Sequence, residues 1–121
     1  MFGQLQVMVV EDSWHIASAI KSMIENVGMQ VVGPAATLTE ALQVLAASHP
    51  DMAVVDVNLQ GDLAYGLIDQ LLDRAIPVVI VSGYEISPAL ANRADTVLKK
   101  PIRASVLLTT LRAIAAKRLV S

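Results

Sequence analysis

Four short apolar runs in this 121-residue chain end at polar side chains that could do chemistry together. The runs cover residues 7–10, 52–55, 78–81 and 97–98, and the polar residues at their ends are Glu11 and Asp12, Asp56, Ser82, and Lys100. Buried parallel strands have such continuous apolar runs, and the carboxyl ends of parallel strands lie on one edge of a sheet. A lone aspartate after a strand often only caps a turn, but four such ends predict one shared crevice.

The three carboxylates of this crevice predict a bound divalent cation. Glu11, Asp12 and Asp56 would repel one another at short range, which raises the pKa of at least one of them unless a cation joins the group. Oxygen ligands without histidine or cysteine suit a hard ion, Mg²⁺ or Mn²⁺. The backbone carbonyl of Asn58, together with waters, is well placed to complete an octahedron.

The remaining two polar residues favour phosphate chemistry. Lys100 supplies a positive charge and Ser82 a hydroxyl, and both groups suit phosphate oxygens better than a carbon substrate. A carboxylate nucleophile at Asp56, a divalent ion, a lysine and a hydroxyl together describe an aspartyl-phosphate site.

Length and composition indicate one α/β domain over residues 1–121. The chain is aliphatic and only 3% aromatic, and its net charge of −2 gives no reason to expect nucleic-acid binding. The absence of cysteine excludes disulfides, thiolate metal sites and thiol catalysis. No run approaches the length of a membrane span and no basic segment precedes an apolar one near Met1, so we expect a cytoplasmic protein without membrane contact.

Apolar periodicity predicts five strands alternating with five helices. The expected strands cover residues 5–10, 30–35, 52–56, 77–82 and 96–99. The expected helices cover residues 14–27, 38–48, 63–74, 88–93 and the chain from 103 onward. Parallel strands joined by helices cross over with one hand, which predicts a three-layer sandwich with helices on both faces of the sheet.

Helix starts and buried helix faces are also readable. Ser13 and Ser87 are expected N-caps, and Thr37 and Glu40 are spaced as a capping box. The predicted buried stripe of the second helix is Leu38, Leu42 and Leu45, and that of the last helix is Val106, Leu107, Leu111, Ile114 and Ala115.

The order of the motifs resembles the receiver domains of two-component response regulators. The matching residues are Glu11-Asp12, Asp56, Ser82-Gly83 and Lys100-Pro101, and they extend over essentially the whole chain. Four separate matches in order make the resemblance specific, whereas any single one would be weak. The resemblance implies a flavodoxin-like (βα)5 fold with strand order 2-1-3-4-5.

The resemblance also implies a role for each residue. Asp56 would accept a phosphoryl group from a phosphohistidine of a sensor histidine kinase or a histidine phosphotransfer protein. Glu11 and Asp12 would help to bind Mg²⁺, directly and through water, while Lys100 would contact the phosphate. Ser82 would move to hydrogen-bond it and thereby change the affinity for a downstream protein. Such a receiver phosphorylates and dephosphorylates itself and belongs to no conventional enzyme class.

Two positions concern the switch that reports phosphorylation. Val97 stands where receivers usually have an aromatic residue, so the usual aromatic switch does not carry over. Tyr84 instead follows Ser82 and Gly83, which resembles a Gly-Tyr subgroup of stand-alone receivers. We therefore expect Tyr84 to act as a switch residue with Ser82, and phosphorylation to order residues 84–94.

Three smaller expectations complete the sequence-based picture. The resemblance and the turn after the fifth strand predict a cis Lys100-Pro101 bond. Trp14, next to the acidic pair, is expected at the crevice rim in contact with a partner. If the chain is complete, it is a single-domain receiver that acts by docking or by passing phosphate on in a phosphorelay.

Two alternative functions remain open. Aspartate-dependent phosphohydrolases also attack phosphate with a carboxylate at a strand end, but they generally need a second acid two residues later, where Asn58 stands. A degenerate receiver used only for binding is the other alternative, and the full set of polar site residues argues against it.

Overall fold

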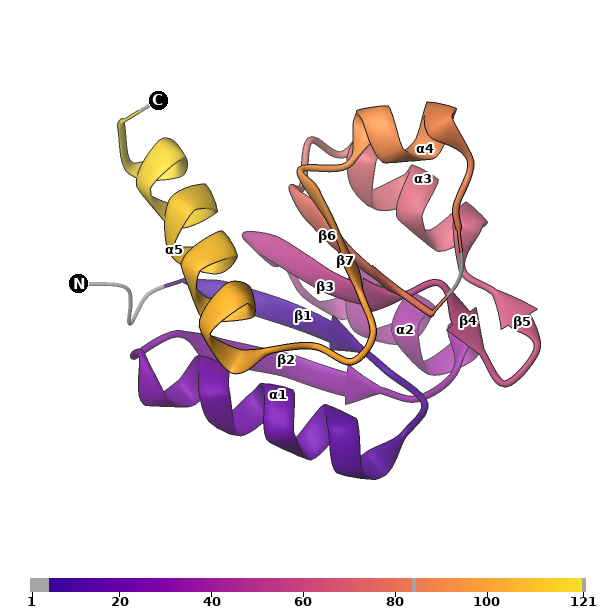
Figure 1. The fold of residues 1–121 in the computed structure, drawn as a ribbon, viewed down its shortest axis with the longest axis horizontal. Coiled ribbons are helices and arrows are strands. Elements are labelled where there is room, and N and C mark those ends of the chain that lie inside the picture. The colour runs from indigo at the N-terminus through magenta and orange to yellow at the C-terminus, as the bar shows by residue number, and fades with distance from the viewer. Residues whose placement is uncertain (1–4, 84, 121) are drawn as a thin grey trace.

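The computed structural model describes residues 5–83 and 85–120, and in this part of the chain strands alternate with helices (Figure 1). The long strands are β1 (Gln6–Val10), β2 (Gln30–Ala35), β3 (Met52–Asp56), β6 (Val78–Ser82) and β7 (Thr96–Lys99). The helices are α1 (Trp14–Asn26), α2 (Leu38–Ala47), α3 (Tyr65–Asp73), α4 (Pro88–Arg93) and α5 (Ala104–Val120). The short strands are β4 (Asn58–Leu59) and β5 (Asp62–Leu63).

The five long strands form one parallel sheet in the order β2-β1-β3-β6-β7. Counted along the chain, this is the predicted order 2-1-3-4-5, with β2 and β7 at the two edges. Because every strand runs the same way, all five carboxyl ends reach the same edge of the sheet (Figure 1).

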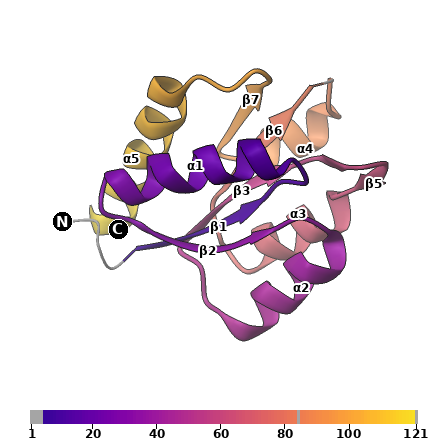
Figure 2. The same cartoon turned by 90° about the horizontal axis from the view of Figure 1, so that it is seen from below.

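Side chains alternate between the two faces of the sheet, and each face has its own helices (Figure 2). Val7 and Val9 of β1 face α1 and α5, whereas Met8 and Val10 face α2, α3 and α4. Each fully buried aliphatic side chain of these two layers contributes roughly 1.5–3 kcal/mol to folding. The predicted three-layer sandwich is confirmed.

The predicted helix starts are confirmed by their capping hydrogen bonds. Ser13 Oγ accepts from the Ile16 backbone N at 3.4 Å, and Thr37 Oγ1 accepts from the Glu40 backbone N at 3.1 Å. Ser87 Oγ accepts from the backbone N of Leu90 at 3.2 Å, and Pro88 occupies the first turn of α4. Local sequence therefore fixes where α1, α2 and α4 begin.

The short helix α4 is held by one buried side chain and one charged clamp. Leu90 is buried in the same core layer as side chains of α3, and Arg93 donates to both Asp69 Oδ1 at 2.7 Å and Asp73 Oδ1 at 3.0 Å on α3. The Lys99–Glu85 pair, at 2.9 Å, connects β7 to the segment before α4. Exposed ion pairs of this kind contribute little individually, so Leu90 is the main anchor of this helix.

A hairpin between β3 and α3 was not predicted. Sequence periodicity placed Leu63 in a helix, but Leu63 belongs to β5, which pairs antiparallel with β4, and α3 begins only at Tyr65. The hairpin turn has two residues of positive φ, Gln60 at 54° and Gly61 at 95°. Glycine adopts such a left-handed conformation freely, whereas the same conformation destabilises a residue with a Cβ atom by roughly 1–2 kcal/mol.

Two predicted core residues are also wrong. Leu42 of α2 is 41% exposed and Val106 of α5 is 42% exposed. In α2, Ala41 is buried in place of Leu42, whereas Leu45 is buried as predicted and Leu38 packs against the core.

Two peptide bonds before proline are cis. The Lys100-Pro101 bond is cis as predicted, and the Gly33-Pro34 bond is cis as well, which the sequence did not indicate.

Among the described helices, α5 is the longest, and neither it nor any other combines the length and apolar character needed to cross a bilayer.

Candidate functional site

The parallel register brings the predicted polar residues together at the carboxyl edge of the sheet. Val10 pairs with Val55, so the residues that follow them, Glu11 and Asp56, leave adjacent strands at the same level. On the other side, the Lys100 backbone N donates to the Ser82 carbonyl oxygen at 3.0 Å. The resulting crevice has a volume of about 440 Å³ and is lined by Asp12, Asp56, Asn58, Gln60, Gly61, Gly83 and Lys100.

Asp56 lies at the floor of this crevice with both carboxylate oxygens engaged. The side chain is buried, and the exposed fraction of the residue is 3%. Its Oδ1 accepts from the Asn58 backbone N at 3.1 Å, and its Oδ2 accepts from Lys100 Nζ at 2.8 Å. These contacts fix the direction in which the carboxylate faces the crevice.

Glu11 is even more deeply buried, and its carboxylate is only partly satisfied. Its Oε2 accepts from the Ser13 backbone N at 3.0 Å. Its Oε1 lies 3.3 Å from Lys100 Nζ and, within the described part of the chain, has no hydrogen-bond partner. Burial, helped by the neighbouring Asp12 and Asp56 carboxylates, raises the pKa of Glu11 from 4.5 to about 7, against the opposing effects of Ser13 and Lys100.

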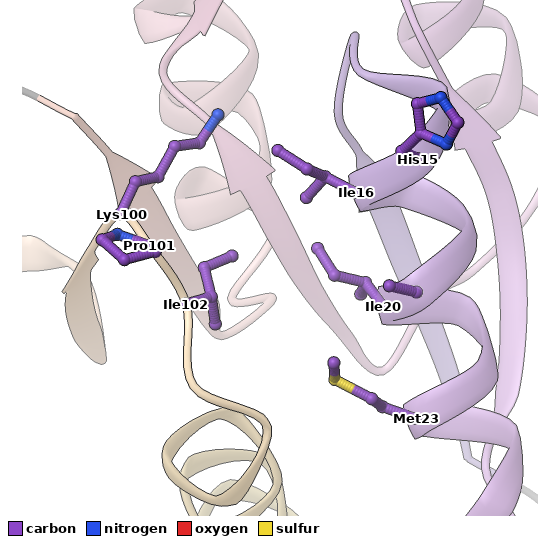
Figure 3. A pocket seen from close by; sticks show the side chains of 8 residues that line it. His15, Ile16, Ile20, Met23, Lys100, Pro101 and Ile102 are labelled. Carbon is purple, nitrogen blue, oxygen red and sulfur yellow. The ribbon is translucent and has the colours of Figure 1, made fainter.

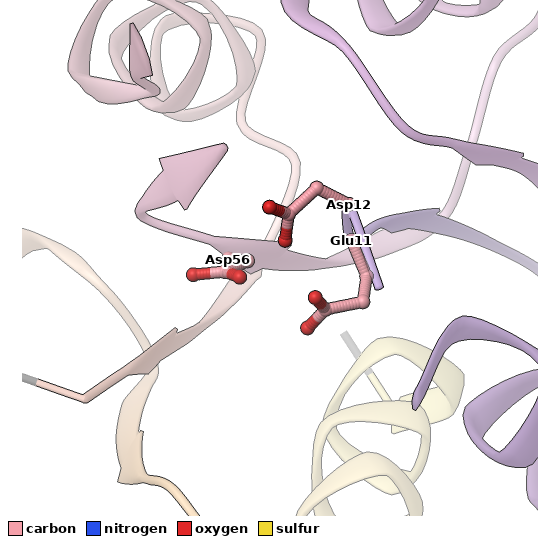
Figure 4. A group of neighbouring side chains, drawn as sticks. All are labelled: Glu11, Asp12 and Asp56. Carbon is pink, nitrogen blue, oxygen red and sulfur yellow. The ribbon is translucent and has the colours of Figure 1, made fainter. Parts of the chain in front are cut away.

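The three carboxylates point towards one another (Figure 4) and fit a divalent cation. Glu11, Asp12 and Asp56 each offer an oxygen within 4.8 Å of the others. An all-oxygen donor set suits a hard ion such as Mg²⁺ or Mn²⁺, and the buried Glu11 Oε1, which lacks a hydrogen bond, is available to such an ion. Asn58, the fourth predicted ligand, lines the same crevice, while its side-chain oxygen accepts from the Gly61 backbone N at 2.7 Å.

Lys100 is the cation that offsets this cluster of negative charge. Its burial favours the neutral amine, but the hydrogen bond to Asp56 and the charges of Glu11 and Asp56 outweigh that effect and raise its pKa. Lys100 therefore remains protonated at neutral pH and points its ammonium group into the crevice.

Ser82, the last residue of β6, and Gly83, which follows it, differ in exposure. Ser82 is 3% exposed and ends β6, as predicted. A Cβ atom placed on Gly83 would meet no atom within 4 Å, so the crevice has open space beside this residue.

The predicted switch is only partly visible. Tyr84 lies outside the described residues, so its switch role and the ordering of residues 84–94 stay predictions. Val97 is half-buried and packs against the core layer that includes α4. Val97 thus takes the position at which receivers usually have an aromatic switch residue.

An apolar groove beside the crevice was not predicted from the sequence (Figure 3). This α1 groove has a volume of about 530 Å³ and is lined by His15, Ile16, Ala19, Ile20, Met23, Lys100, Pro101 and Ile102. Trp14, the residue before His15 on α1, is 74% exposed, and its ring lies edge-to-face against that of His15 at a centroid distance of 5.2 Å. Since Lys100 lines both the groove and the crevice, the two sites are adjacent.

Known proteins support this assignment of the fold. Residues 7–112 match the response regulator receiver domain family. The transcriptional regulatory protein YxdJ of Bacillus subtilis is 27% identical over 112 residues, which cover 88% of this chain and 48% of that protein. The chain thus spans about half the length of this curated relative.

Two solved structures have the same fold. A CheY-like receiver domain from Methylobacillus flagellatus is 28% identical with a TM-score of 0.79, over 91% of this chain and 98% of that one. A response regulator from Burkholderia pseudomallei is 26% identical with a TM-score of 0.78, over 97% of this chain and 72% of that one. The latter structure contains a phosphorylated aspartic acid, a calcium ion and citrate. The present chain belongs to the response regulator receiver domains of two-component signalling.

Proposed function

We propose that Asp56 is the phosphoryl acceptor of this receiver domain. The observation that carries the proposal is the 2.8 Å contact between Lys100 Nζ and Asp56 Oδ2 inside a cluster of three carboxylates. A buried carboxylate held in one direction beside a lysine is arranged for attack on phosphorus. The phosphorylated aspartic acid in the related Burkholderia pseudomallei structure supports the same role here.

The chain's own residues divide the work of phosphoryl transfer. Asp12, Asp56 and the Asn58 carbonyl would hold Mg²⁺ or Mn²⁺ with help from Glu11, and the ion when bound neutralises charge on the transferred group. An oxygen of Asp56 attacks the phosphorus of a phosphohistidine, and the P–N bond to the donor breaks. Lys100 then exchanges its carboxylate contact for a phosphoryl oxygen.

Ser82 is the proposed reporter of the added group. It ends β6 next to the open space at Gly83, on the same edge of the sheet as Asp56. A hydroxyl that turns towards a phosphoryl oxygen would carry the segment after it along, which shifts an existing equilibrium between two arrangements of that segment. In this way a local hydrogen bond changes the surface read by a downstream protein.

The phosphohydrolase alternative has weaker support. It needs an acid two residues after the nucleophile, but Asn58 occupies that position and its side-chain oxygen is already bound by Gly61 within the hairpin turn. Stoichiometric labelling of the chain by a small phosphodonor, without turnover of a stable phosphate monoester, separates the receiver from the hydrolase. Absence of both reactions would indicate a module used only for binding.

Replacement of Asp56 by asparagine should abolish phosphorylation. Incubation of the wild-type chain with acetyl phosphate and Mg²⁺ should add the mass of one phosphoryl group, because the carboxylate nucleophile is present. Asp56→Asn should remain unmodified in intact-protein mass spectrometry, whereas Asp62→Asn, which changes an exposed residue of the nearby hairpin, should behave like wild type. A single phosphoryl group on the Asp56→Asn protein would sink the assignment.

Mg²⁺ should raise the melting temperature of the wild-type chain at pH 7.5 by several degrees. A cation removes the mutual repulsion of three carboxylates, and a ligand at one hundred times its Kd adds about 2.7 kcal/mol of stability. Asp12→Ala should lose most of this gain in differential scanning calorimetry, and Asp62→Ala should keep it. An equal gain in Asp12→Ala would contradict a metal site built on the acidic pair.

The stability of the metal-free chain should fall as the pH rises from about 4.5 to 7. Over this window the folded protein keeps on Glu11, whose pKa is raised to about 7, a proton that the unfolded chain has released. Glu11→Gln removes this titration, so the variant should be more stable than wild type at pH 8 by up to roughly 3 kcal/mol, at about 1.4 kcal/mol per pKa unit. The two proteins should converge near pH 5.

Urea denaturation in the presence of a chelator, at pH 5 and pH 8, measures this difference. Glu25→Gln, which changes an exposed glutamate on α1, is the matched control and should show no pH-dependent difference from wild type. A Glu11→Gln effect of equal size at both pH values would show that Glu11 is charged throughout.

Phosphoryl transfer from a protein requires a docking surface next to the crevice. The α1 groove is apolar, shares Lys100 with the crevice and is lined by His15, whose ring contacts the exposed ring of Trp14. A histidine kinase or histidine phosphotransfer protein that covers this groove would bring its phosphohistidine over Asp56. The groove is therefore the proposed site for the phosphodonor protein.

Trp14→Ala should slow transfer from a phosphohistidine protein at least about ten-fold, because exposed tryptophans at interfaces contribute disproportionately to binding. Loading from acetyl phosphate should be unchanged, since Trp14 is not part of the crevice lining. Leu63→Ala removes a similarly exposed apolar side chain from the hairpin and serves as the control. Equal slowing of both reactions would mean that Trp14 acts on the crevice itself and not on docking.

A further inference from the structure

One side chain of the crevice has no part in the phosphorylation scheme. Of the seven lining residues, Asp12, Asp56 and Lys100 hold the cation or the phosphoryl group through their side chains, and two are glycines. The side-chain oxygen of Asn58 is bound within the hairpin turn, which leaves Gln60. Its neutral amide can both donate and accept hydrogen bonds. Among the described residues of the crevice wall, this is the side chain equipped to hold a water molecule without neutralising a charge.

The hairpin turn does not explain why a glutamine stands at this position. Gln60 has φ = 54°, a conformation that glycine and asparagine adopt more readily, and two-residue hairpin turns favour those residues at this place. The turn is already closed by the 2.7 Å hydrogen bond from the Gly61 backbone N to Asn58 Oδ1. A glutamine at position 60 therefore strains the backbone of the turn, but it also provides an amide side chain at a position that lines the crevice.

We propose that Gln60 positions the water that hydrolyses the aspartyl phosphate, so that it sets the lifetime of the phosphorylated state. This inference rests on the proposed role of Asp56. Hydrolysis requires a water opposite the bond between phosphorus and the Asp56 oxygen, which is on the solvent side of the added group. Gln60 is exposed and is one of the residues that line the crevice, so its amide is within reach of that solvent side.

The reaction that Gln60 assists is balanced by water alone. The water oxygen bonds to phosphorus, the bond between phosphorus and the Asp56 oxygen breaks, and the electron pair returns to the carboxylate. Both hydrogens of the water stay with the departing phosphate as dihydrogen phosphate. The side-chain carbonyl of Gln60 accepts a hydrogen bond from the water and orients its lone pair towards phosphorus.

The loading of Asp56 with a phosphoryl group provides an internal control. During loading the nucleophile is Asp56 itself, and no water attacks. A residue that positions water should thus change the rate of phosphate loss and leave the rate of loading from acetyl phosphate unchanged. A residue that only shapes the crevice or supports the cation should change both rates together.

Gln60→Gly is the sharpest variant, because it removes the amide and at the same time relieves the strained backbone of the turn. Its hydrolysis rate constant should fall about five-fold, the effect of losing one hydrogen bond to the reacting water. Gln60→Asn retains an amide on a shorter side chain and should also be slow. Asp62→Asn, on the same hairpin, should hydrolyse at the wild-type rate.

The experiment loads each protein with acetyl phosphate, removes the donor by rapid desalting and follows phosphate loss by intact-protein mass spectrometry, with Mg²⁺ and with chelator. Slower loss with unchanged loading in Gln60→Gly, under both conditions, supports the proposal. Unchanged or faster loss, or equal slowing of loading and loss, overturns it. A wild-type chain that is never loaded would instead refute the role of Asp56, so the two failures are distinguishable.

Discussion

The crowding of three carboxylates at one edge of the sheet is the constraint on which the rest of the site depends. Glu11, Asp12 and Asp56 offer oxygens within 4.8 Å of one another, at a distance where like charges repel strongly unless they are compensated. In the metal-free chain the compensation is incomplete. Lys100 approaches two of the carboxylates, and burial raises the pKa of Glu11 to about 7, so that this group holds a proton over much of the acidic range.

The carboxylates cannot relieve this repulsion by moving apart, because the strands that hold them are fixed. β1 and β3 lie in the interior of the sheet, pair in register from Val7 to Val10, and are covered by helices on both faces. The energy of two core layers thus holds a locally unfavourable arrangement in place. A cation or a phosphoryl group with its counter-charge enters a site that is already formed, and little rearrangement opposes its binding.

The sheet and the crevice could be predicted from the sequence, because both follow from apolar runs that are as long as a strand. Apolar runs ending in Glu11, Asp56, Ser82 and Lys100 located both the sheet and the crevice, because strand direction alone brings these ends together. The β4–β5 hairpin was missed because two-residue strands are too short to show a period. The burial of Ala41 instead of Leu42 and the raised pKa of Glu11 depend on distances between elements, which a single sequence does not contain.

The floor of the crevice is held by buried strands, whereas its rim consists of exposed turns and loops. Asp56 and Glu11, on the floor, are fixed by buried strands, so a substitution that moves them also disturbs the core. Gln60 and Gly83 line the crevice from a turn and a loop, and Trp14 is exposed in the first turn of α1, so these positions can change without altering the core. With the roles proposed for these residues, the chemistry of phosphorylation is tied to the fold, whereas the lifetime of the phosphoryl group and the choice of donor can be adjusted independently of it.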